Sequence, residues 1–155
     1  MTTNTLQPGR ELDALIATTF FGWEWKQYQA PNWTEPYLLT LLVPPAAPGR
    51  IRIMNRYDRI WRESDASAKR FDGWDESYWW HDGEMHKGFP HYSTDIAAAW
   101  QVVEHFERLT YTTALHSIID GWVCSFRGVR YADAAQAPTA PHAICLAALK
   151  AIGAV

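Results

Sequence analysis

The stretch HYSTDIAAAWQVVEHFERLT, residues 91–110, decides the fold, because it is the most regular amphipathic helix in the chain. Ser93 or Thr94 is placed to accept a hydrogen bond from the first turn, and Asp95 adds negative charge at the positive end of the helix dipole. Apolar residues recur at steps of three and four, which predicts one buried face: Ile96, Ala99, Trp100, Val103 and Phe106. We expect Trp100 to be the largest anchor between this helix and its partner layer.

Two further helices are predicted, over residues 9–22 and 140–152. In the first, the positions that follow the helical step are Leu12, Leu15, Ile16, Thr19 and Phe20. Gly22 is expected to end it in the left-handed conformation. The last helix is expected to begin at Thr139 or Ala140. Its predicted buried stripe is Cys145, Ala148, Leu149 and Ile152.

Two strands are predicted in the first half of the chain. Residues 37–43, YLLTLLV, form a nearly continuous apolar run that suits a buried strand. Over residues 50–54, Ile51 and Ile53 alternate with Arg50, Arg52 and Met54. This alternation predicts a half-buried strand that Ile60 and Trp61 extend or pair with.

A hairpin is predicted in the second half, where SIIDGWVCSF places Asp120-Gly121 between β-rich flanks. We expect a type I′ turn at this dipeptide, an extension of the second strand by Val129 and Tyr131, and a loop over residues 132–140. The order of the elements predicts an α+β fold with three helices on a mainly antiparallel sheet. Helices on both faces would make it a three-layer α/β/α sandwich.

Composition limits the classes of function. A chain of 155 residues, 48% hydrophobic and 20% charged, fits a single globular domain over residues 1–155. It has no apolar run of about 18 residues and no secretory signal pattern, so we expect no membrane span and a cytoplasmic location. The net charge of −3 argues against bulk nucleic acid as a partner. Cys124 and Cys145 are expected to be free, buried thiols.

Residues 62–90 show no clear period and are expected to form a long irregular segment. They are polar, aromatic and rich in turn residues. A loop of this length in a compact domain is usually functional or disordered, and the aromatic content argues against disorder.

Three blocks of sequence carry a resemblance to a known family. They are GRELDALIA at residues 9–17, YSTDIAAAWQVVE at 92–104 and APHAICLAALKA at 140–151. Together they resemble the phage ABA sandwich domain family, which consists of small proteins of phages and prophages. The resemblance implies an α/β/α layering and a role that is not enzymatic. Some small phage proteins of similar size act as sponges for nucleotide immune signals.

Five neighbouring residues carry side chains that could hold a divalent metal: His81, Asp82, Glu84, His86 and His91. His and carboxylate side chains are common metal ligands, but this spacing matches no zinc motif. We therefore expect solvated loop residues, no bound metal and no cofactor.

Catalysis has little support in the sequence. Neither cysteine is accompanied by a recognisable nucleophile arrangement, and the chain has no GxSxG, P-loop or GxGxxG motif. We expect the protein not to be an enzyme.

A basic tract next to an aromatic run is the strongest candidate for a ligand site. The tract consists of Arg50, Arg52, Arg56, Arg59, Arg62, Lys69 and Arg70. Arginine binds phosphate oxygens, and aromatic planes stack on bases. The candidate ligand-binding residues are Arg56, Arg59, Arg62, Arg70, Trp74, Tyr78, Trp79, Trp80 and His81, with Tyr92, Ser93 and Thr94 at the start of the helix over residues 91–110. The competing interpretation is that the arginines pair with nearby carboxylates and the aromatic residues cap the core.

The expected function follows from this site. We expect a phage or prophage accessory protein, a homo-oligomer, that binds a small nucleotide-like anion without turnover and sequesters an immune signal of bacterial anti-phage defence. The alternative is a protein–protein inhibitor or structural module that binds a host protein through its Trp-rich segment.

Overall fold

The computed structural model describes residues 6–29, 38–43, 52–54, 62–63, 78–81, 84–87, 89–128 and 134–154. Within residues 26–88 it describes the backbone of the strands and the side chain of Leu42. The chain divides into two compact units. Unit 1 consists of Met1–Phe20 and Pro90–Val155, and unit 2 of Phe21–Phe89. The single domain predicted over residues 1–155 stays a prediction.

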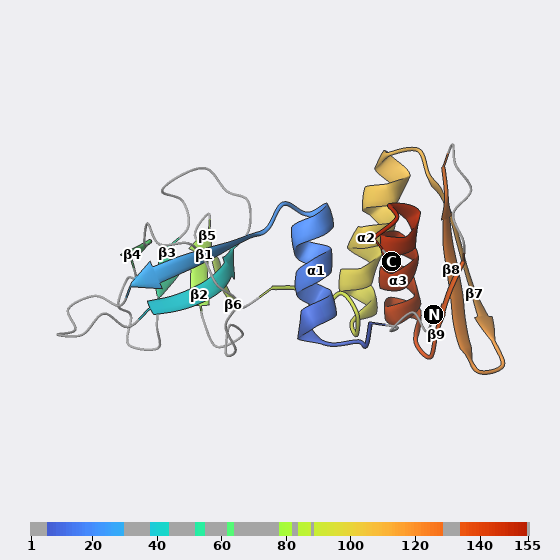
Figure 1. Cartoon of the computed structure of the whole chain (residues 1–155), viewed down its shortest axis with the longest axis horizontal. Helices are drawn as coiled ribbons and strands as arrows, with labels where there is room; N and C mark the ends of the chain where they lie inside the picture. Colours follow the sequence, from blue (N-terminus) through green and yellow to red (C-terminus); the bar gives the residue numbers. More distant parts are fainter. Residues whose placement is uncertain are drawn as a thin grey trace. The chain divides into compact units, whose positions relative to one another are not determined.

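Unit 1 contains three helices and a three-stranded antiparallel sheet (Figure 1). The helices are α1 (Arg10–Phe20), α2 (Ile96–Arg108) and α3 (Ala140–Ala151). The strands are β7 (Thr112–Ile118), β8 (Gly121–Arg127) and β9 (Ala135–Ala137), in the order β7-β8-β9. Figure 1 shows α2 and α3 on the same face of this sheet, with α1 beyond them. The predicted α+β class is confirmed, while the three-layer arrangement stays a prediction.

Helix α3 lies at the centre of unit 1. All ten residues from Ala140 to Leu149 are buried, and the helix packs against β8 and β9 as well as α1 and α2. A helix that is apolar on all sides is expected in such a position. The predicted stripe was therefore too narrow, and its last member, Ile152, is exposed beyond the helix end. The helix begins at Ala140, one of the two positions predicted, and Thr139 caps it by accepting a hydrogen bond from the His142 N–H group.

An aromatic cluster joins α1, α2 and the sheet. The Phe106 ring stacks on the Phe126 ring with centroids 4.3 Å apart, and Phe20 and Tyr111 contact Phe106 at 5.3 and 5.0 Å. Burial of this large apolar area fixes α2 over the hairpin.

Helix α2 buries a face that differs from the predicted one. The buried residues are Ala98, Ala99, Val102, Val103 and Phe106. Trp100 is 46% exposed, so the expectation that it anchors the helix is wrong. Small alanines on the buried face fit the packing of α2 against α3, and this rotates the larger Trp100 and Ile96 toward solvent.

Unit 2 contains two three-stranded antiparallel sheets. One has the order β2-β1-β4, with β1 at Glu24–Gln29, β2 at Leu38–Val43 and β4 at Arg62–Glu63. The other has the order β3-β5-β6, with β3 at Arg52–Met54, β5 at Tyr78–His81 and β6 at Glu84–Lys87. The strands predicted over residues 37–43 and 50–54 are confirmed by β2 and β3. Ile60 and Trp61 lie outside the described residues.

The expectation that residues 62–90 are irregular is wrong where β4, β5 and β6 form. Strands β5 and β6 pair from His81↔Glu84 to Tyr78↔Lys87, so two residues separate them. Those two residues are Asp82-Gly83, a dipeptide typical of hairpins. The short flanks, four residues each, carry too little periodicity to stand out in the sequence.

The hairpin of β7 and β8 is confirmed, but its turn is displaced by one residue. The pairing Ile118↔Gly121 leaves Ile119 and Asp120 as the two turn residues, and neither has a positive φ, so the turn is not type I′. Gly121 instead lies close to the backbone of β9, because a Cβ atom at this position would be 2.3 Å from the Ala137 carbonyl oxygen. The predicted loop over residues 132–140 therefore contains strand β9. Val129 and Tyr131 lie outside the described residues.

Candidate functional site

Strand β5, with the sequence Tyr-Trp-Trp-His, is the central strand of its sheet and places four of the candidate residues in one register. Arg52 of β3 is directly opposite Trp80, and Lys87 of β6 is directly opposite Tyr78. Because alternate residues of a strand belong to the same face, these four positions share one face of the β3-β5-β6 sheet. We call these four residues the cation–aromatic face.

The other face of the same sheet carries the remaining two members of β5. Trp79 is opposite Ile53 and His86, and His81 is opposite Glu84. His81, Glu84 and His86 therefore share that face. Among the residues described with their side chains, no group of three or more His, Cys, Asp or Glu could hold a metal ion.

The remaining basic candidates are distributed differently. Arg62 belongs to β4, in the other sheet of unit 2, opposite Gln29. Arg56, Arg59, Arg70 and Trp74 lie outside the described residues. Arg52 and Lys87 were not among the candidates, although Arg52 belonged to the basic tract. Only the strand register places these two beside the aromatic residues.

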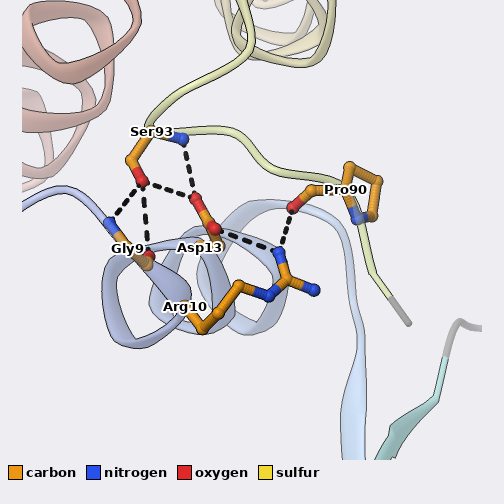
Figure 2. Close-up of polar contacts among 5 residues, drawn as sticks. All are labelled: Gly9, Arg10, Asp13, Pro90 and Ser93. Carbon is orange, nitrogen blue, oxygen red and sulfur yellow. Dashed lines mark hydrogen bonds and ion pairs between the residues drawn. The ribbon is translucent and has the colours of Figure 1, made fainter. Parts of the chain in front are cut away.

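Ser93, a candidate at the start of α2, belongs to a buried polar network in unit 1 (Figure 2). The Asp13 carboxylate accepts hydrogen bonds from both the Ser93 N–H group and the Ser93 hydroxyl, each at 2.7 Å. The Ser93 hydroxyl also accepts one from the Gly9 N–H group at 2.9 Å. Arg10 donates to the second carboxylate oxygen at 3.0 Å and to the Pro90 carbonyl at 3.3 Å.

This network connects segments that are 80 residues apart in the sequence. Asp13 and Ser93 are 1% and 0% exposed, so charge-assisted hydrogen bonds replace the lost water around the carboxylate. Arg10 is a local partner of Asp13 on the same helix, whereas Ser93 belongs to a distant segment of the chain, and no local pattern in the sequence reveals that pairing.

The start of α2 is capped by Asp95, whose carboxylate accepts a hydrogen bond from the Ala97 N–H group at 3.1 Å. The prediction that Ser93 or Thr94 is the cap is therefore wrong by one or two residues. Tyr92 is buried, and Thr94 is exposed. Because Tyr92 and Ser93 have no surface to offer to a ligand, we leave both out of the ligand site.

The two cysteines are free and buried, as predicted. Burial raises the pKa of Cys124 to about 12. Burial also raises the pKa of Cys145 above its usual range, with a further contribution from the negative charge of Asp13. Both side chains therefore stay as thiols near neutral pH, where only a thiolate would act as a nucleophile.

The described residues thus define an α+β protein with a helical unit built around α3 and a strand unit that carries the cation–aromatic face. The model of the phage ABA sandwich domain matches residues 14–149, so the chain belongs to this family and is a phage-derived protein with an ABA sandwich domain. A crystal structure of a phage protein from Bacillus cereus ATCC 14579 is similar in fold. It has 22% sequence identity and a TM-score of 0.50, over 98% of this chain and 93% of that one.

The comparison with curated proteins gives no match. None of the helices within the described ranges is long and apolar enough to cross a membrane.

Proposed function

We propose that the protein is a phage or prophage accessory protein that binds a small anionic ligand without turnover, and that this ligand is a nucleotide immune signal of bacterial anti-phage defence. In this proposal the ligand is sequestered, so the protein acts as a sponge in the host cytoplasm. The observation that carries the proposal is the register of the β3-β5-β6 sheet, which places Arg52 opposite Trp80 and Lys87 opposite Tyr78.

The chemistry of these residue types supports a nucleotide. A guanidinium group binds two phosphate oxygens at once, and an ammonium group adds a second positive charge for a further phosphate. Indole and phenol rings stack on bases, with a contribution of roughly 1–3 kcal/mol per base in nucleic-acid binders. Two cations and two aromatic residues on one face are therefore suited to a ligand that has both phosphates and planar bases.

The charge distribution supports a local anion site. The chain has a net charge of −3, and it contains 14 Lys and Arg residues. Seven of these belong to the tract between Arg50 and Arg70, so positive charge is concentrated in a protein that is acidic as a whole. A local site in an acidic protein favours a small anion over a long polyanion such as DNA.

Isothermal titration of the protein with a panel of cyclic dinucleotides, cyclic trinucleotides and cyclic ADP-ribose isomers tests the proposal. The expected result is saturable binding of at least one compound and its recovery unchanged after release by heat denaturation. Binding that is accompanied by conversion of the compound would contradict the non-catalytic part of the proposal. Absence of binding across the panel would contradict the ligand class.

A further inference from the structure

Strand β7 forms one edge of the sheet in unit 1. Its seven residues, Thr112–Ile118, pair with β8 without interruption, and no described strand pairs with its other side. The opposite edge, β9, has only three residues. An edge strand presents a row of backbone N–H and C=O groups that can pair with another strand.

The sequence of β7 lacks the features that usually protect an edge. Proteins discourage edge pairing with charged residues, proline, bulges or very short strands. The sequence TTALHSI contains no Asp, Glu, Lys, Arg, Pro or Gly, and its register with β8 shows no bulge. No residue of β7 is buried, and Thr112, His116 and Ser117 are exposed.

We propose that β7 pairs with β7 of a second copy of this chain, antiparallel and about a two-fold axis, to give a continuous six-stranded sheet. A two-fold interface brings the same surface of both subunits together, so the strand must be compatible with a second copy of its own sequence opposite it. The seven uncharged residues of β7 meet this requirement, because no pairing register places like charges opposite each other. This inference does not depend on the proposed ligand.

Sedimentation equilibrium of the full chain tests the pairing. The expected mass is twice the 17.7 kDa of the chain at micromolar concentration. The double variant Thr112→Lys/His116→Lys adds positive charge at two exposed positions of β7, and the expected dimer affinity falls at least tenfold. The matched control is Gln101→Lys/Gln136→Lys, which adds the same charge at exposed positions of α2 and β9 and should stay dimeric.

Amide hydrogen exchange provides a second measurement that does not rely on the variants. Backbone N–H groups of β7 that point away from β8 should be protected at high protein concentration and should exchange faster on dilution. A monomer at all concentrations, a dimer equally weakened by both double variants, or β7 amides whose exchange is independent of concentration would each overturn the inference.

Discussion

The Asp13 carboxylate and the Ser93 hydroxyl lie 2.7 Å apart, both buried, and they connect the first turn of α1 to the turn before α2. Without Asp13, the buried Ser93 N–H group would lose its acceptor, and the Ser93 hydroxyl would keep only the Gly9 carbonyl oxygen at 3.3 Å. Breaking a buried charged network by removing one partner typically costs about 3–5 kcal/mol. We therefore predict that Asp13→Ala lowers the free energy of unfolding in urea by about this amount. Thr19→Ala, an exposed change on the same helix, should alter it by less than about 0.5 kcal/mol.

The same network predicts a smaller effect of Ser93→Ala. The Asp13 carboxylate keeps the backbone N–H bond but loses the hydroxyl, and the Gly9 N–H group loses its acceptor. The expected loss in urea unfolding is about 1–3 kcal/mol. The neighbouring Thr94→Ala is the control, because Thr94 is exposed. Equal effects of the two changes would show that the network does not stabilise unit 1.

The residues that follow α2 and α3 predict two substitutions with opposite effects on stability, one stabilising and one destabilising. Thr110 and Gly153 occupy equivalent positions after the two helices, with φ of 68° and 75°. In both cases the N–H groups of this residue and the next one donate to carbonyls of the last turn, at 2.9–3.0 Å. Glycine adopts this left-handed conformation without strain, whereas a β-branched residue does not.

We therefore expect Thr110→Gly to raise the free energy of unfolding by about 1 kcal/mol and Gly153→Thr to lower it by about 1–2 kcal/mol. Thermal unfolding followed by circular dichroism measures both. If Thr110→Gly were destabilising, the strain argument would be wrong for α2.

Alanine substitutions at two glycines with nearly the same φ distinguish backbone strain from steric clash. Gly9 and Gly121 have φ of 146° and 148°. A Cβ atom on Gly9 meets nothing within 4 Å, whereas one on Gly121 would overlap the Ala137 carbonyl oxygen. Both alanine variants should lower the free energy of unfolding, because a residue with a Cβ atom is strained at this positive φ. Gly121→Ala should lower it by about 1–3 kcal/mol more, because β9 must move to make room for the Cβ atom. Similar losses in urea unfolding would contradict the close approach of β9.

Alkaline pH should destabilise the protein, because two buried cysteine thiols and one buried tyrosine hydroxyl resist deprotonation in the folded state. Burial raises the pKa of Cys124 from 9.0 to about 12 and raises those of Cys145 and Tyr92 above their usual ranges. Between the unfolded and folded pKa values the folded state holds more protons than the unfolded state, so stability falls as pH rises. Urea unfolding midpoints should therefore decrease from about pH 9 upward.

The double variant Cys124→Ala/Cys145→Ala tests the source of this decrease. It should show a shallower fall of the urea midpoint above pH 9 than the parent, since Tyr92 is then the one of these three buried groups that still titrates. At pH 8 a thiol reagent should label neither cysteine in the native protein and both in urea. Rapid labelling of the native protein would show that these thiols are accessible.

The sequence predicted the helices well because their signals are local. Apolar spacing identified all three, and α3 begins at Ala140, one of the two positions predicted for its start. The orientation of α2 was mispredicted because two adjacent apolar faces compete in the sequence, and packing of alanines against α3 decided between them. The pairing of Asp13 with Ser93 depends on residues 80 positions apart and has no local signal.

The candidate site was only partly predictable for the same reason. The aromatic residues of β5 stand out by composition, so the sequence identified Tyr78 and Trp80. Arg52 is 28 positions before Trp80, and only the antiparallel register of β3 with β5 selects it from the other arginines of the tract. A missed hairpin therefore concealed which cations lie beside the aromatic residues.

The most direct test of the ligand proposal is titration of variants against the compound that binds best in the panel. We predict that Arg52→Gln and Trp80→Leu each weaken binding at least tenfold in isothermal titration. The matched controls in unit 1, Arg108→Gln and Trp100→Leu, change exposed side chains of the same types and should leave the affinity unchanged. Unchanged affinity in both unit 2 variants would contradict the assignment of the site to the cation–aromatic face.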